Sequence, residues 1–361
     1  MLKDRAQKAL ALRMCVSKRW APYLEVDVDS AQRLDARRSL LTDIDVLAVA
    51  QSPIGQPCRY IFDCKSGARE SAISRAFWLS GVMTRLSVDH GFVILNKKIN
   101  ISNDHRASAR DLAVTLVHEP DFESLASGMQ ATTGPIDSSV SDIDAWEHFI
   151  DSHNARELDQ YMVFSRSEYW MLRDPGERLR KIVARLRAIN SELDPARPRH
   201  FAIFADALSL LLLAVSELTS SLFLVLLRPA TQEAFSGALL AALYGGVDRL
   251  AATQRVRHLV SGHGPGEGEP LFPELPRLER LVREMLQAPR EGLHASLLAR
   301  EIGFSRLQNR DTRNTQSTWI REAPYAAKFI VLASDFIRRA CRLPPDFDIQ
   351  ISDHVLPIAS V

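Results

Sequence analysis

The sequence lacks the features that identify the commonest metal, nucleotide and hydrolase sites. Its four cysteines are scattered without a CxxC pair and its ten histidines are dispersed, so spacing predicts neither a zinc site nor a disulfide framework. No GxxxxGKS or GxxxxGKT, GxSxG or HExxH pattern occurs, which argues against a P-loop and a nucleotide cofactor. The cysteine usage favours a reducing, cytoplasmic compartment.

An excess of charge of either sign is also absent. The chain has 45 basic and 44 acidic side chains in 361 residues, so a nucleic-acid binder with this balance would have to gather its basic residues locally. The opening segment MLKDRAQKALALRM lacks the continuous apolar run of a signal peptide. Ordinary globular composition and this length together predict two domains.

One long apolar run is present, at residues 207–227, and it has the length of a membrane span. Glu217 lies at its middle among serine and threonine side chains, and a central carboxylate is costly in lipid. We therefore interpret this run as a helix, or a broken pair of helices, buried in a helical core or a subunit interface, and expect no membrane partner. A membrane-associated regulator built around the run is the competing hypothesis.

Hydrophobic periodicity predicts an α/β unit followed by helices. The expected order is a helix at 4–20, strands at 23–29, 39–50 and 58–66, a helix at 68–86, a strand at 90–99, and a helix with a short strand within 108–125, opened by a serine N-cap at Ser108. We predict an α/β domain at residues 1–126 with a mixed sheet covered by helices on both faces, a linker at 127–142, and an all-α domain at 143–361.

Charged residues recur on two of the predicted strands. Side chains two apart on a strand share a face, so Asp63 and Lys65 point the same way, as do Asp43 and Asp45. Turn residues separate the two strands, and pairing as a hairpin would bring Asp45 close to Asp63. Carboxylates bind Mg²⁺, which activates water and relieves charge in phosphodiester hydrolysis. A lysine beside the metal can orient or deprotonate that water, or neutralise the developing charge. The alternative is that these residues are solvated turn or edge residues.

DIDVLAV, a turn, and then IFDCKS together resemble the PD-(D/E)xK, or restriction-endonuclease-like, nuclease superfamily. The resemblance covers residues 1–125 and implies that Asp45, Asp63 and Lys65 are catalytic, with Mg²⁺ or Mn²⁺ held by Asp45 and Asp63. Asp43 and Glu25 are further candidate metal ligands. It also implies a role in restriction, repair, recombination or defence against foreign DNA.

Two features depart from the pattern that the superfamily implies. Its first helix often carries a glutamate, whereas the helix expected here offers only Asp4. Its second helix often carries a glutamine, for which Arg69, Glu70 or Arg75 are the candidate replacements.

Basic residues gather in three places that a DNA backbone could contact. The candidates are Arg33, Arg37 and Arg38 in RLDARR, Arg69 after the motif, and Arg178, Lys181 and Arg185 in GERLRKIVARLRA. An ordinary solvated helix face is the alternative for the last group.

The leading functional hypothesis is a Mg²⁺-dependent DNA endonuclease whose helical half forms a homo-oligomer or binds a partner protein. The alternative is a catalytically inactive nuclease fold that serves as a DNA- or protein-binding subunit. The missing glutamate on the first helix favours this second reading.

Overall fold

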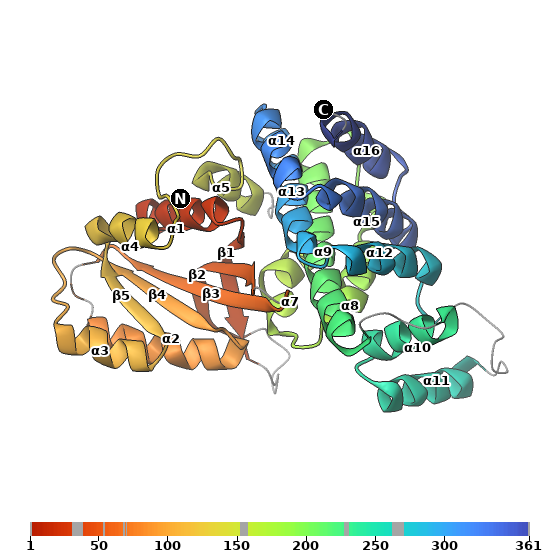
Figure 1. Ribbon diagram of the computed structural model, residues 1–361, viewed down its shortest axis with the longest axis horizontal. Helices are drawn as coiled ribbons and strands as arrows, with labels where there is room; N and C mark the ends of the chain where they lie inside the picture. The colour runs from red at the N-terminus through yellow and green to blue at the C-terminus, as the bar shows by residue number, and fades with distance from the viewer. Residues whose placement is uncertain are drawn as a thin grey trace. The chain divides into compact units, whose positions relative to one another are not determined.

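The computed structural model of the chain describes residues 2–30, 39–52, 55–67, 69, 71–151, 158–226, 231–261 and 271–359. An N-terminal mixed five-stranded sheet with helices is followed by a largely helical C-terminal region, as the periodicity predicts (Figure 1). By contacts the chain divides into two compact units, the first made of Met1–Met171 with Arg300–Thr315 and the second of Leu172–Ala299 with Gln316–Val361. The first unit thus extends past residue 126, the predicted end of the α/β domain.

The sheet has the strand order β1-β2-β3-β4-β5. Its strands are β1 (Ala21–Asp29), β2 (Leu40–Gln51), β3 (Pro57–Lys65), β4 (His90–Leu95) and β5 (Val114–His118). β1, β2 and β3 are antiparallel neighbours, whereas β3, β4 and β5 run parallel. The predicted hairpin is confirmed, because β2 pairs with β3 from Gln51↔Pro57 to Val46↔Phe62.

Helices cover both faces of the sheet. Figure 1 shows α1 (Arg5–Ser17) and α4 (Phe122–Gly128) on one face, and α2 (Ala72–Leu86) and α3 (Asn103–Asp111) on the other. The ring of Phe62 on β3 stacks on Phe92 of β4 at 4.8 Å and meets Phe122 of α4 edge-on at 6.4 Å. Because strand side chains alternate, Asp63 faces the opposite side, toward α2.

Two local expectations are corrected by the structure. The N-cap of the helix before β5 is Ser102 rather than Ser108, because the Ser102 hydroxyl accepts a hydrogen bond from the His105 N–H at 3.1 Å. β4 ends at Leu95 rather than at residue 99. On α1 the buried stripe includes Lys8, Leu12 and Cys15.

Residues 127–142, the predicted linker, include a buried turn. The carboxylate of Glu301 accepts hydrogen bonds from the Ser138 hydroxyl at 2.6 Å, the Ser139 N–H at 2.9 Å and the Val140 N–H at 3.0 Å. Four consecutive residues of the turn, 138–141, are at most 3% exposed. The segment is therefore fixed within the first unit by a distant part of the chain. Along the chain it is followed by α5 (Ile143–Asp151), α6 (Asp159–Val163), the π-helical turn η3 (Phe164–Glu168) and α7 (Tyr169–Met171).

The rest of the described chain is helical. Its longer helices are α8 (Pro175–Ala188), α9 (Pro198–Leu226), α10 (Gln232–Leu243), α11 (Val247–Ser261), α12 (Leu275–Gln287), α13 (Glu291–Leu307), α14 (Arg313–Glu322), α15 (Tyr325–Cys341) and α16 (Asp346–Ala359). Residues 207–226 of the apolar run lie in one helix, α9, rather than in a broken pair, and Leu227 lies outside the described residues. Among the described residues, α9 alone is long and apolar enough to cross a membrane, and most of it is buried.

Candidate active site

The site forms where β2 and β3 stop pairing. Their ladder ends at Val46↔Phe62, so the next residues toward the sheet end, Asp45 and Asp63, lie beside each other without a ladder bond between them. The Asp45 carboxylate accepts the N–H of Cys64 at 2.6 Å through Oδ2, in place of a backbone carbonyl. Asp45 and Asp63 are only 4% and 3% exposed, so both acids need charged or hydrogen-bonding partners.

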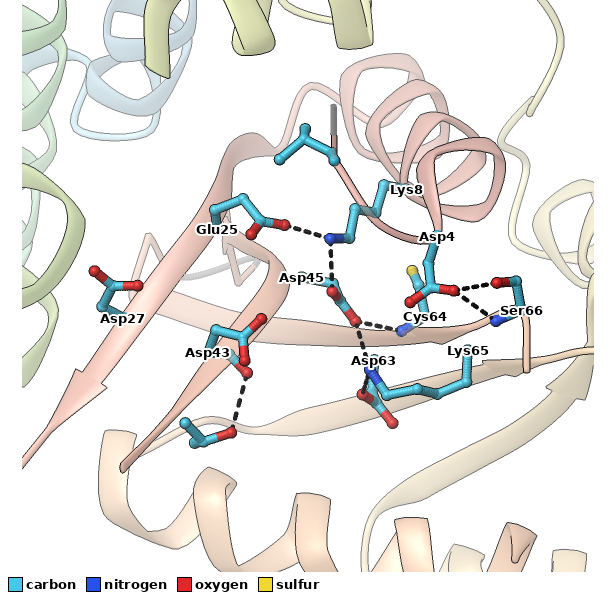
Figure 2. Close-up of polar contacts among 12 residues, drawn as sticks. Asp4, Lys8, Glu25, Asp27, Asp43, Asp45, Asp63, Cys64, Lys65 and Ser66 are labelled. Atoms are coloured by element: carbon cyan, nitrogen blue, oxygen red, sulfur yellow. Dashed lines mark hydrogen bonds and ion pairs between the residues drawn. The ribbon is translucent and has the colours of Figure 1, made fainter. Parts of the chain in front are cut away.

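Lys65 joins the two acids. Its Nζ lies 3.4 Å from Asp45 Oδ2 and 3.1 Å from Asp63 Oδ1 (Figure 2). On its other side Asp63 is bound by Arg75 of α2 through both carboxylate oxygens, with Nε to Oδ2 at 2.8 Å and Nη2 to Oδ1 at 2.6 Å. Arg75 itself lies over the Trp78 ring at 3.9 Å, which fixes the guanidinium.

Lys8 of α1 supplies a third cation. Its Nζ lies 2.9 Å from Asp45 Oδ1 and also pairs with the carboxylate of Glu25 on β1 (Figure 2). The Lys8 side chain is 2% exposed, so this ammonium is almost wholly withdrawn from water. Across the three strands the charges alternate in the order Glu25, Lys8, Asp45, Lys65, Asp63 and Arg75.

Glu25 reaches this row through a strained backbone. It has a φ of 55°, a left-handed conformation that is unusual for a non-glycine residue within a strand. The neighbouring pairs Leu24↔Val46 and Val26↔Ile44 hold the strand on either side of it. Arg166 of η3 donates to the Glu25 carbonyl at 3.1 Å, so a second element fixes the same residue.

The start of α1 is tied to the end of β3. The Asp4 carboxylate accepts a hydrogen bond from the Ser66 N–H at 2.8 Å and another from the Ser66 hydroxyl. The Gln7 side-chain amide donates to the Lys65 carbonyl at 3.2 Å and to Glu119 at 3.1 Å. These contacts place Lys8, one residue along the helix, above Asp45.

The charged neighbours govern the protonation of the site. Burial lowers the pKa of Lys65, but Asp63 and Asp45 outweigh burial and hold this pKa above its ordinary value. The pKa of Lys8 is likewise raised, because Asp45 and Glu25 overcome the effect of burial. Burial dominates for Asp45 and Glu25, whose pKa values are raised. Lys65 is therefore an ammonium, suited to neutralise charge or donate to a water rather than to act as a base.

The donor chemistry of the site is compatible with a hard divalent cation. Mg²⁺ needs only one or two carboxylates, since it keeps several waters and takes other oxygens from a phosphate, and Asp45 with Asp63 would supply the two carboxylates. Among the described residues, no three histidine, cysteine, aspartate or glutamate side chains converge closely enough to hold a metal by themselves. The three acids of the row are balanced by three cations, which compete for the carboxylates.

The structure brings together Asp45, Asp63 and Lys65, with Glu25 beside them. Asp43 lies exposed at the rim, and within the described part of the chain it takes no part in the row of ion pairs. Of the candidates for the missing glutamine, Arg75 contacts Asp63, Arg69 is exposed, and Glu70 lies outside the described residues. Arg33, Arg37 and Arg38 also lie outside the described residues.

Arg178, one of the predicted DNA-contact residues, has a buried side chain. It is 1% exposed and pairs with Glu217 of α9 at 2.6 Å, because the polar centre of that apolar helix needs a cation. Lys181 is exposed and Arg185 half-buried on the same helix, and all three belong to the second compact unit.

Sequence reasoning did not identify Lys8. A usable signal was present, because Lys8 falls at helical spacing with Leu12 and Cys15, on a stripe that would otherwise be apolar. A lysine on such a stripe needs a buried acid as its partner. Arg166 gave no such signal, because its contact with Glu25 depends on the chain folding back over 141 residues.

A scan against protein-family models finds no family that matches this chain. Comparisons with curated proteins and with solved structures find no match either.

Proposed function

We propose that the first unit is a Mg²⁺-dependent nuclease that hydrolyses phosphodiester bonds in DNA, with a restriction-endonuclease-like fold. The observation that carries this proposal is the single ammonium of Lys65 held between Asp45 and Asp63, at 3.4 and 3.1 Å, where two antiparallel strands part. The order of elements supports it as well, because a helix precedes the three antiparallel strands, and a helix and a parallel strand follow Lys65.

In the proposed hydrolysis each residue of the site would have a different role. Asp45 and Asp63 would hold Mg²⁺, which when bound supplies an activated water and charge relief at the phosphate. Lys65 donates toward the attacking water or a phosphate oxygen, since its ammonium already faces both acids. Arg75 releases one or both Asp63 oxygens and is then free to neutralise phosphate charge.

The direct test is incubation of the purified chain with supercoiled plasmid and with single-stranded DNA, with and without Mn²⁺ or Mg²⁺. The wild-type protein should cleave only with metal, and Lys65→Ala should reduce the rate at least 100-fold while leaving the circular dichroism spectrum unchanged. Lys328→Ala is the matched control, because Lys328 also pairs with an acid, Glu284 at 2.6 Å, but lies in the second unit. Equal cleavage by wild type and Lys65→Ala would refute the assignment.

The second candidate function is an inert nuclease fold that binds DNA or a protein. The specific observation in its favour is that three buried or half-buried cations balance the charge of the three acids. Titration calorimetry separates the two candidates: an inert fold should give no Mn²⁺ binding at millimolar concentration and no cleavage of either DNA. Saturable Mn²⁺ binding that Asp63→Asn abolishes would favour the enzyme.

A further inference from the structure

The three acids of the row are separated by two gaps, one between Glu25 and Asp45 and one between Asp45 and Asp63. Asp45 is shared between two ammonium groups, with Lys8 at 2.9 Å from Oδ1 and Lys65 at 3.4 Å from Oδ2. The Lys8 ammonium also pairs with Glu25, so it lies between these two carboxylates (Figure 2). Lys65 pairs with both Asp45 and Asp63, and its side chain is more exposed, at 24% against 2% for Lys8.

Two carboxylates that flank an ammonium also present the oxygen ligands that a hard divalent ion prefers. Many phosphodiester hydrolases use two such ions, about 3.5–4 Å apart, which requires a bridging carboxylate with an acid on each side. Glu25, Asp45 and Asp63 have this order across β1, β2 and β3. Here each of the two gaps holds a covalently attached ammonium, the buried Lys8 between Glu25 and Asp45 and the more exposed Lys65 between Asp45 and Asp63.

We propose that Lys8 is a resident cation that fills the gap between Glu25 and Asp45 and limits the site to one divalent ion, held by Asp45 and Asp63. This inference rests on the proposed nuclease function and assigns its metal stoichiometry. Lys8 is a positioning residue, because it fixes Asp45 Oδ1 and leaves Oδ2 to face Lys65. The strained backbone of Glu25 is part of the same arrangement, since it directs that carboxylate toward Lys8.

Replacing Lys8 by a neutral side chain would leave the buried carboxylate of Asp45 and the half-buried carboxylate of Glu25 without the cation between them. That change should destabilise the metal-free protein, because an acid buried without its cation keeps its desolvation penalty. It should also open the Glu25–Asp45 gap to a divalent ion. A purely structural lysine would show the first effect without the second.

The experiment is Mn²⁺ binding to the full chain, followed by calorimetry and by the electron paramagnetic resonance signal of free Mn²⁺. The wild type should bind one ion and Lys8→Met two, with total uptake near saturation doubled. Adding Mn²⁺ should raise the Tm of Lys8→Met more than that of the wild type, because a ligand of the folded state stabilises it by mass action. The double variant Lys8→Met/Glu25→Gln should lose the added ion.

Arg178→Met provides the matched control. It also removes a buried cation from a buried carboxylate, Glu217, but the pair belongs to the second compact unit and not to the row of acids. Its Tm should fall, and Mn²⁺ should not restore it. Lys8→Gln, which keeps a hydrogen-bond donor without charge, replaces Lys8→Met if the latter is insoluble, with the same expected gain of one ion.

Equal Mn²⁺ stoichiometry and affinity in the wild type and the neutral Lys8 variants would overturn the inference. Recovery of Arg178→Met by Mn²⁺ to the same extent would also overturn it. Failure of the nuclease proposal looks different: the wild type would then bind no Mn²⁺ and cleave nothing. Even then, a gain of one ion on removal of Lys8 would support Lys8 as the cation of that gap.

Discussion

At the scale of single residues, Glu25 combines backbone strain with a charged contact. A left-handed conformation at a non-glycine residue costs on the order of 1–3 kcal/mol and persists only when its surroundings determine it. The surroundings here are Arg166 on its carbonyl and Lys8 on its carboxylate. Strain of this kind concentrates where side chains must be aimed, which agrees with the placement of Glu25 beside Asp45.

Asp45 should be the acid on which the stability of this region depends most. Asp45→Ala leaves the Lys8 ammonium with one acid in place of two and the Cys64 N–H without its acceptor, so we expect a loss of about 3 kcal/mol in the free energy of unfolding. Asp43→Ala, two residues away and exposed, should change it by less than about 0.5 kcal/mol. Urea denaturation followed by fluorescence measures both, and similar losses for the two variants would contradict the ion-pair row.

The four thiols should differ sharply in reactivity. Burial raises the pKa of Cys15, Cys64 and Cys341 and hides them from reagents, while Cys58 is only half-buried although its pKa is also raised by burial and by Asp89. Because the thiolate is the reactive form, labelling of the native protein with Ellman's reagent should modify one thiol, faster at higher pH. Peptide mapping should identify Cys58, and four thiols should react in guanidinium chloride. Rapid native labelling of Cys64 would mean that the site region is open.

At the scale of elements, the parting of β2 from β3 creates the site. Paired strands satisfy their own backbone groups, so a side chain can take over as acceptor only where the ladder ends. The ladder ends at Val46↔Phe62, and the Asp45 carboxylate takes over at Cys64. The helices then bring cations from both faces, Lys8 from α1 and Arg75 from α2.

The start of α3 offers a test of the local structure. Ser102→Ala removes the hydroxyl that accepts from the His105 N–H at 3.1 Å, and should cost about 1 kcal/mol. Ser108→Ala, at an exposed position inside the same helix, should have an effect within about 0.5 kcal/mol of zero. Paired thermal melts compare them directly. A larger loss of stability in Ser108→Ala than in Ser102→Ala would instead support Ser108 as the N-cap, as the sequence pattern predicted.

At the scale of the whole molecule, the first unit is completed by residues far along the chain. The Arg300 guanidinium lies 3.6 Å from the Tyr23 ring and donates to the Pro22 carbonyl at 3.0 Å. Glu301, the next residue, binds the turn at 138–141. The sheet and its site therefore depend on a segment that follows them by more than 150 residues.

Glu301→Gln should weaken the first unit. In the wild type, three donors of the turn at 138–141 bond to the two carboxylate oxygens of Glu301. In the variant, an NH₂ group replaces one of these oxygens, so at least one buried donor loses its acceptor, at a cost of about 2 kcal/mol in the free energy of unfolding. Glu123→Gln, an exposed change in the same unit, is the control and should be neutral. Hydrogen exchange at the Val140 amide should speed up in Glu301→Gln alone. Unchanged protection there would contradict a role for Glu301 in fixing the turn.

Local patterns determined a large part of this protein. Strand alternation put Asp63 and Lys65 on one face, turn residues between two apolar runs specified the β2–β3 hairpin, and 3.6-residue periodicity predicted the helical second half. These features depend on neighbours within a few residues, which the order of amino acids encodes directly. The approach of Asp45 to Asp63 follows from the hairpin and was predicted for that reason.

Tertiary structure alone decided which cations meet the acids. Lys8 and Arg75 reach Asp45 and Asp63 only because helices from opposite faces of the sheet dock at one end of β3, and no spacing rule links residues 8 and 45. For the same reason Arg178, which helical periodicity alone left as a surface candidate, became a buried partner of Glu217. Charge pairing across a fold is a long-range interaction, set by packing that brings distant segments together, and in the proposed site it would determine how many carboxylates remain for a metal.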